Sequence, residues 1–172
     1  GSFGQDLFQG TGNTPIFKDG WKDQNTWLRE NLGKESWESA KDSILNAFFT
    51  DPYTVQAMWS MAEKMGFTGG RVLEPAVGTG NFISLMPQSI KARSQVTAID
   101  LDITTASISK QLFPESNVQN IPYQKSKTPD NFYDLVITNV PFSNDVKIAD
   151  RRYNQFNPNL HDYFFLKALD QV

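Results

Sequence analysis

A strand, a glycine turn and a helix that follow one another near the middle of the chain most restrict its fold. Arg71–Glu74 is predicted to be the strand, Gly78 and Gly80 the turn, and Asn81–Met86 the helix. Glycine permits a positive φ in such a turn and lets a ligand approach the backbone closely. The turn is not a Walker loop, because no Gly-Lys-Ser/Thr follows it, and a dinucleotide fingerprint would have a third glycine where Ile83 stands.

The chain beyond this turn continues to alternate between strands and helices. Strands are predicted at Gln95–Asp100, Val118–Ile121 and Tyr133–Thr138, and helices at Thr104–Leu112 and Leu160–Gln171. Such alternation predicts an α/β fold, a Rossmann-like doubly wound parallel sheet with helices on both faces. Since the chain stops in or just after the last helix, we expect a sheet truncated after its fourth strand, and a fragment of a longer protein.

The residues before the first of these strands are predicted to be irregular and then helical. Residues 1–33 are expected to form a loop or flexible segment, since Phe3–Gly20 is rich in Gly and Asn and lacks periodicity. Residues 34–66 are expected to be helical, with Asp51 capping a second helix and Gly66 ending it. One face of the first of these helices carries Trp37, Ala40, Ile44, Leu45 and Phe48.

Composition excludes several kinds of site. The 172 residues contain no Cys and one His, so disulfides and cysteine nucleophiles are ruled out and we predict no metal site. The net charge of −3 is unlike that of a domain that grips DNA by itself. No apolar run is long enough to span a membrane and no signal peptide opens the chain, which favours a cytoplasmic protein.

Acidic residues end the first two predicted strands, where both face the crevice at the carboxyl edge of the sheet. Glu74 ends the first strand and Asp100 the second, with Asp102 as a nearby competitor. A carboxylate at the second position can accept two hydrogen bonds from ribose hydroxyls. The alternative is an acidic strand end that water solvates, but the glycine turn beside it favours a ligand pocket.

A second candidate site follows the last apolar strand, in Asn139-Val140-Pro141-Phe142. The carbonyl of an Asn side chain and a backbone carbonyl can accept both hydrogens of an exocyclic amino group, which aims the nitrogen lone pair at a methyl sulfonium. Pro141 stiffens the loop, and Phe142 offers a face on which a flipped base can stack. The alternative is a strand-end turn, since Asn and Pro are common turn residues.

With these residues, the chain resembles the S-adenosylmethionine-dependent N6-adenine DNA methyltransferases. Leu73–Phe82 is similar to their glycine motif, and Asn139–Phe142 to their Asn-Pro-Pro-Tyr/Phe motif, with Val140 in place of a Pro. Ala47–Pro52 is similar to the segment that contacts the methionine end of the donor. A narrower resemblance, to the methyltransferase modules of large phage and mobile-element proteins that also carry a helicase-like region, rests on Asn139–Phe142, Asp150–Tyr153 and His161–Phe165.

The resemblance implies a class I methyltransferase fold in a catalytic subdomain spanning residues 34–172, with S-adenosylmethionine as cofactor and methyl transfer to adenine N6 in DNA. Its catalytic residues would be Asn139, Pro141 and Phe142. Where the family has an acidic residue that meets the donor's adenine, this chain offers Gln124 or Asn120. The residues implied to bind the donor are Thr50, Glu74, Ala76, Gly78, Gly80, Asp100 and Gln124.

The resemblance also implies partners. This chain alone is expected to bind DNA weakly. A target-recognition or helicase-like domain of the same polypeptide is expected to supply the remaining affinity for DNA. The exposed edge of the Tyr133–Thr138 strand predicts self-association. Two other functions stay open, namely methylation of glutamine side chains in protein, whose amide suits the same Asn-Pro site, and a donor-binding module without catalysis. A cytosine-C5 methyltransferase is excluded, because it needs a Cys nucleophile.

Other conspicuous residues have simpler explanations. His161 is predicted to lie in the first turn of the last helix, behind an N-cap at Asn159. Phosphates could contact Lys147, Arg151 and Arg152, together with Tyr153, although a solvated loop explains these residues equally well.

Overall fold

The computed structural model of this protein describes residues 8–9, 16–17, 19–38, 50–141 and 148–172. The chain divides into two compact units. The first comprises residues 1–48 with 102–104, and the second residues 49–101 with 105–172.

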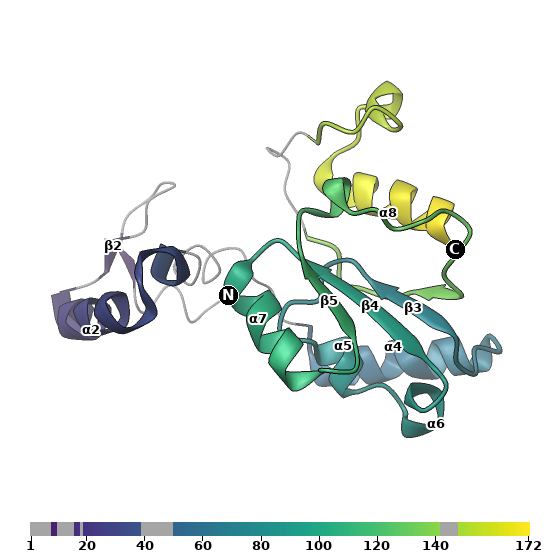
Figure 1. The fold of residues 1–172 in the computed structure, drawn as a ribbon, viewed down its shortest axis with the longest axis horizontal. Helices are drawn as coiled ribbons and strands as arrows, with labels where there is room; N and C mark the ends of the chain where they lie inside the picture. The colour runs from purple at the N-terminus through teal and green to yellow at the C-terminus, as the bar shows by residue number, and fades with distance from the viewer. Residues whose placement is uncertain (1–7, 10–15, 18, 39–49, 142–147) are drawn as a thin grey trace. The chain divides into compact units, whose positions relative to one another are not determined.

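The first unit contains a short hairpin and a helix (Figure 1). Strand β1 (Phe8–Gln9) pairs antiparallel with β2 (Ile16–Phe17), and the 3₁₀-helix η1 (Asp19–Trp21) leads into α2 (Lys22–Leu32). A loop or flexible segment was predicted here, so α2 corrects that prediction. Helix α2 has only three large apolar residues, Trp27, Leu28 and Leu32, and it buries none of its residues. Of the face predicted for the next helix, Trp37 is helical in the structure, and the other four residues lie outside the described ranges.

A four-stranded parallel sheet forms the centre of the second unit (Figure 1). Its strands are β3 (Arg71–Glu74), β4 (Gln95–Asp100), β5 (Asn117–Asn120) and β6 (Leu135–Val136), in the spatial order β5-β4-β3-β6. The predicted parallel sheet is confirmed, with β3 and β4 at their predicted bounds and β5 one residue earlier. Strand β6 is shorter than predicted.

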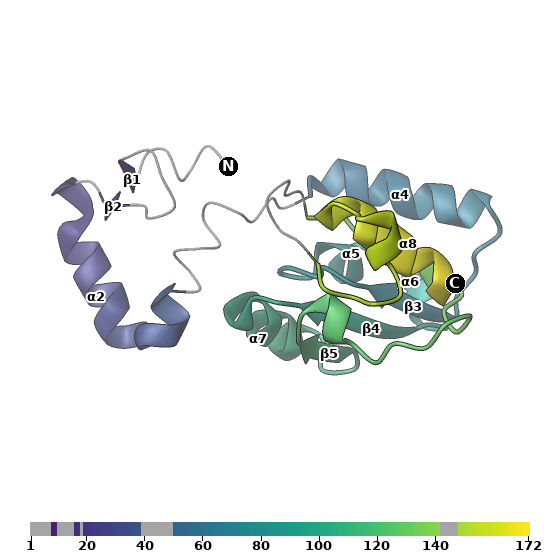
Figure 2. The ribbon, with the colours of Figure 1, turned by 90° about the horizontal axis from the view of Figure 1, so that it is seen from above.

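Helices cover both faces of this sheet, as the doubly wound fold requires. On one face lie α4 (Pro52–Lys64), α5 (Asn81–Ser84), α6 (Gln88–Lys91) and α7 (Ile103–Leu112), and on the other lies α8 (Leu160–Gln171) (Figure 1, Figure 2). The predicted N-cap of α4 is confirmed.

The side chain of Asp51 accepts a hydrogen bond from the backbone N–H of Tyr53 at 2.9 Å. Beyond α4, Gly66 takes a φ of 96°, a conformation that favours glycine after a helix end.

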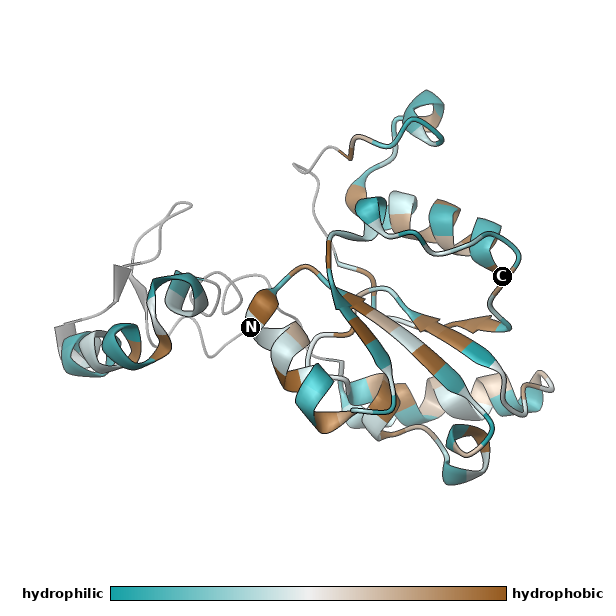
Figure 3. Cartoon of the chain, viewed as in Figure 1, coloured by the Kyte–Doolittle hydropathy of each residue, from teal (hydrophilic) through white to brown (hydrophobic). Residues whose placement is uncertain are grey.

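Alternate residues of the strands point to opposite faces and bury them under different helices. Val72 of β3 packs with Trp59 of α4, whereas the next residue, Leu73, packs with Tyr163 of α8. Trp59 is buried, and its ring N–H donates to the carbonyl of Phe82 at 2.9 Å. Figure 3 shows hydrophobic residues concentrated along the strands. This core fixes the sheet between its two helical layers. None of the helices in the described ranges is long and apolar enough to cross a membrane.

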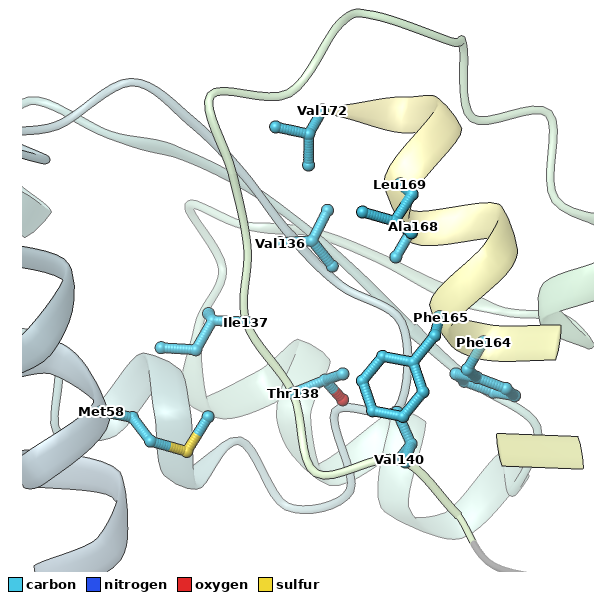
Figure 4. A pocket seen from close by; sticks show the side chains of 10 residues that line it. All are labelled: Met58, Val136, Ile137, Thr138, Val140, Phe164, Phe165, Ala168, Leu169 and Val172. Carbon is cyan, nitrogen blue, oxygen red and sulfur yellow. The ribbon is translucent and has the colours of Figure 1, made fainter. Parts of the chain in front are cut away.

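Strand β6 is the last strand of the sheet, and among the described residues it pairs only with β3. An apolar groove of about 280 Å³ lies beside it. Figure 4 shows side chains of α8, including Phe165 and Leu169, on one side of this groove and Met58 of α4 on another, with Val136 and Ile137 between them. The two helical layers therefore leave a hydrophobic recess at this edge of the sheet.

Candidate functional site

The glycine turn after β3 is held between β4 and α7. The N–H of Gly78 donates to the carboxylate of Asp100 at 2.7 Å, and the carbonyl of Gly78 accepts from the hydroxyl of Ser109 at 2.7 Å. Ser109 is fully buried in α7, and the N–H of Val77 donates to the carbonyl of Ile99 at 2.9 Å. These bonds from neighbouring elements fix the turn at the carboxyl edge of the sheet. Sequence reasoning missed Ser109, since a serine in a helix carries no local signal of such a bond.

The two glycines of the turn have different surroundings. Both have a positive φ, 54° at Gly78 and 85° at Gly80. A Cβ at Gly78 would meet no atom of the described residues within 4 Å, so the backbone leaves room there for a ligand. A Cβ at Gly80 would collide with the ring of Phe113, so this glycine allows close packing at the start of α5. A direct role of Gly80 in donor binding stays a prediction.

Glu74 is a buried carboxyl at the end of β3. It is 1% exposed, and its Oε2 atom has no hydrogen-bond partner in the part of the chain that the structure describes. Burial raises the pKa of Glu74 well above the usual range, and the charge of Asp100 raises it further. A buried polar atom without a partner is costly, so a ligand that bonds to this carboxyl would be stabilised.

Asp100 ends β4 and joins the glycine turn to β5. Its backbone carbonyl accepts from the side-chain amide of Asn120 at 3.1 Å and from the N–H of Ile121 at 3.0 Å. The amide of Asn120 also donates to the carbonyl of Leu101 at 3.0 Å. Asn120 therefore supports the backbone around Asp100 in this structure.

Thr50 precedes α4, and the structure brings it beside the glycine turn. The side-chain amide of Asn81, at the start of α5, donates to the carbonyl of Thr50 at 3.1 Å. Ala76 is half-buried within the turn and packs against the core cluster that contains Leu73. Gln124 is half-buried in the 3₁₀-helix η2 (Tyr123–Lys125), which follows β5 at the same edge of the sheet.

The Asn139 turn, residues 138–141, leaves β6 next to the end of β3. In the parallel register Val136 lies opposite Leu73, and the N–H of Ile137 donates to the carbonyl of Leu73 at 3.1 Å. Asn139 therefore emerges at the edge of the sheet where β3 enters the glycine turn. Val140 is buried with the aromatic residues of α8, and Pro141 is half-buried. Phe142 lies outside the described residues.

The basic residues that could contact phosphates differ in their surroundings. Arg152 forms ion pairs with Asp130 at 2.9 Å and with Asp170 at 2.8 Å. Tyr153 is buried, and its hydroxyl donates to Asp170 at 2.6 Å. These two residues therefore hold the segment before α8 against its last turn, whereas Arg151 is exposed. Lys147 lies outside the described residues.

The last helix begins close to where it was predicted. His161 lies in the first turn of α8. Asn159 occupies the N-cap position, but its side chain makes no capping bond, and its backbone carbonyl accepts from Tyr163.

No family model matches this sequence, and no curated protein matches it. Solved structures are similar in fold. A type I restriction-modification methyltransferase subunit from Streptococcus thermophilus superimposes with a TM-score of 0.55 at 15% identity, over 80% of this chain and 36% of that one. A protein described as an RNA methyltransferase, from Pyrococcus horikoshii, gives 0.51 at 16% identity, over 72% of this chain and 58% of that one.

An O-methyltransferase from Bacillus cereus, solved in complex with S-adenosylhomocysteine, gives a TM-score of 0.44 at 13% identity, over 90% of this chain and 70% of that one. The chain spans about a third of the first of these three proteins and more than half of the second. The two similarities above 0.5, together with the sheet order, show the Rossmann-like fold of the class I methyltransferases, as the sequence predicted.

Proposed function

We propose that this chain transfers a methyl group from S-adenosylmethionine to the N6 amino group of adenine in DNA, as the catalytic part of a larger protein. The observation that carries the proposal is the parallel pairing of β3 with β6. This pairing puts the glycine turn and the Asn139 turn on adjacent strands at one edge of the sheet, where α/β proteins bind their ligands.

The residues around the glycine turn fit an S-adenosylmethionine molecule. Bound there, this cofactor supplies an electrophilic methyl group on a sulfonium. The open backbone at Gly78 admits a ligand, and the carboxylate of Asp100 can accept hydrogen bonds from ribose hydroxyls. Glu74 provides a buried carboxyl whose Oε2 atom has no hydrogen-bond partner among the described residues, and the carbonyl of Thr50 is bonded to Asn81 beside the turn. Gln124, in η2 after β5, is the residue we assign to the adenine end of the donor.

The Asn139 turn fits an amino group as acceptor. The side-chain carbonyl of Asn139 and the backbone carbonyl of Val140 accept the two hydrogens of the amino group and orient its lone pair. Pro141 has no N–H that would compete, and Phe142 stacks on the base. Once methylated, the nitrogen is positively charged and its proton is acidic, so the reaction needs no dedicated general base.

Two features support DNA as the substrate. The fold is similar to that of a restriction-modification methyltransferase subunit, and the Asn139 turn has residues suited to an exocyclic amino group. The net charge of −3 is unfavourable for holding a polyanion. We therefore expect another domain of the same polypeptide to contribute most of the DNA affinity. We expect this chain alone to bind DNA weakly and to methylate it poorly or not at all.

The proposal is tested in two steps. Calorimetry with S-adenosylhomocysteine measures donor binding to the isolated chain. Transfer of a labelled methyl group by the full-length protein to unmethylated DNA at low salt, followed by analysis of the nucleosides, identifies the product. We expect N6-methyladenine, and at least about a hundredfold less of it with Asn139→Ala. Absence of binding would overturn the donor site, and label found on cytosine or on protein glutamine would overturn the substrate.

A further inference from the structure

A buried lysine on α8 contacts the segment that connects β5 to β6. Lys167 is 5% exposed, and its ammonium group donates to the carbonyl of Tyr123 and, at 3.0 Å, to the hydroxyl of Ser126. The same ammonium lies 4.4 Å from the centre of the Tyr123 ring, in a cation–π contact. Both partners belong to residues 121–134, the β5–β6 loop. Lys167 thus binds this loop on either side of Gln124.

The end of α8 holds the rest of the same loop. Gln171 is fully buried, accepts a hydrogen bond from the hydroxyl of Tyr123 and donates to the carbonyl of Thr128 at 3.3 Å. The backbone N–H groups of Phe132 and Tyr133 donate to the carbonyl of Gln171 at 3.0 and 2.8 Å. The position of the β5–β6 loop therefore depends on α8. Lys167 binds Tyr123 and Ser126, and Gln171 binds Tyr123, Thr128 and the residues before β6.

Stability alone does not account for a lysine at this position. Among the described residues, the hydrogen bonds of its ammonium go to neutral oxygens, and a buried charge without a directly bound counterion is costly. A methionine would fill the same space without that cost. Tyr123 and Ser126, however, offer carbonyl and hydroxyl oxygens that a methionine could not bind. The ammonium is therefore suited to fixing the loop rather than to stabilising the core.

We infer that Lys167 is a positioning residue that holds the β5–β6 loop, and with it Gln124, in the arrangement that receives the adenine end of the methyl donor. This inference rests on the proposed function, since it requires a donor at the glycine turn. Lys167 itself does not contact the donor. It acts through the backbone on both sides of Gln124.

The inference implies a dependence on pH. Burial lowers the pKa of Lys167 to about 8, an effect that Arg152 strengthens and that Asp150 and Asp130 oppose. The tyrosine that faces the ammonium, Tyr123, has a pKa raised far above 10 by burial and stays neutral. As the pH rises through 8, Lys167 loses its charge, its bonds to the loop weaken and donor affinity falls.

Folding stability responds to the same proton in the opposite direction. The folded pKa of Lys167 lies below its unfolded value of about 10.4, so the unfolded chain binds more protons between these two values. The contribution of this group to stability therefore rises with pH across that window. A lysine with a merely structural role would not weaken donor binding while its contribution to stability increases.

The test compares Lys167→Met with Lys64→Met, which removes an exposed lysine at the end of α4. Calorimetry with S-adenosylhomocysteine at pH 7 and pH 9 gives the affinity, and the control corrects for titration of the ligand itself. If the freed loop adopts the binding arrangement about a tenth of the time, affinity falls about tenfold in Lys167→Met at pH 7. We expect the affinity of the wild type for S-adenosylhomocysteine to fall from pH 7 to pH 9. The affinity of Lys167→Met should change only as much as titration of the ligand itself requires.

Amide hydrogen exchange without ligand measures how firmly Lys167 holds the β5–β6 loop, independently of the donor. Residues 121–133 should exchange faster in Lys167→Met, with β3 and β4 as internal references. Ser126→Ala keeps the charge but removes the hydroxyl that accepts from Lys167 and donates to the carbonyl of Tyr123. It should weaken donor binding about two- to threefold, and it decides the matter if Lys167→Met does not fold. Unchanged affinity at both pH values would overturn this inference and leave the proposed function standing. A wild type that binds no S-adenosylhomocysteine would overturn both.

Discussion

The glycine turn and the Asn139 turn lie at the same edge of the sheet, but the structure holds them in different ways. At the glycine turn, Asp100 and Ser109 bind the N–H and the carbonyl of Gly78. At the Asn139 turn, Val140 is buried with the aromatic residues of α8. The glycine turn, the donor half of the proposed site, is thus held by hydrogen bonds from two neighbouring elements. The Asn139 turn, the acceptor half, is held by packing beneath one helix. We expect substitutions in the two halves to separate donor binding from methyl transfer.

Replacing the central residue of the acceptor half should have the largest effect. Asn139→Ala removes an oxygen that orients the amino group, and loss of one such preorganised group lowers the rate by about a hundredfold or more. Donor affinity should stay within about twofold. Single-turnover methylation and calorimetry on the same preparation check both values, and a large loss of donor affinity would break the separation between the halves.

The donor half should respond to Asp100→Ala with a loss of about 1.5–3 kcal/mol in the binding of S-adenosylhomocysteine, the scale of a hydrogen bond to a charged group. The same change frees the N–H of Gly78, so the turn also loses a support. Ser109→Ala removes the hydrogen bond to the carbonyl of Gly78 but no group that contacts a ligand. It should weaken the binding of S-adenosylhomocysteine by about 1 kcal/mol. If Asp100→Ala binds S-adenosylhomocysteine as tightly as the wild type, Asp100 does not bind the donor.

The two glycines of the turn offer a matched pair. Gly80→Ala should destabilise the fold by about 1–3 kcal/mol, because the new methyl collides with Phe113 and φ is 85°. Gly78→Ala adds its methyl to open space. Compared with Gly80→Ala, it should lower the free energy of unfolding less and weaken donor binding more. Thermal unfolding with and without S-adenosylhomocysteine distinguishes them, and the reverse ranking would contradict the surroundings described for both glycines.

A separate effect is expected at the groove beside β6, which borders the Asn139 turn at Thr138 and Val140. We propose that a second copy of the chain covers the groove beside β6, where Phe165 and Leu169 are 57% and 74% exposed. Leu169→Glu should weaken self-association about tenfold in sedimentation experiments, close to 1.4 kcal/mol. Leu112→Glu, at an exposed position on α7, is the control. A wild type that stays monomeric at high concentration would refute this proposal.

Part of the site could be predicted because its signals are local. The apolar runs of β3 and β4, the capping of α4 by Asp51 and the glycines of the turn each depend on residues a few positions apart. Strand β6 was predicted too long, because an apolar run does not reveal where its pairing with β3 ends. Helix α2 was missed, since it buries none of its residues.

The sequence by itself determined that strands and helices alternate, and that a glycine turn and an Asn-Val-Pro turn each follow a strand. Only the tertiary structure decided that these turns are neighbours, since β6 pairs with β3 across more than 60 residues of chain. It also decided that Ser109 supports Gly78, and that Lys167 binds the loop around Gln124. Such bonds join residues 31 and 44 positions apart, and no periodicity or local propensity encodes a partner at that distance.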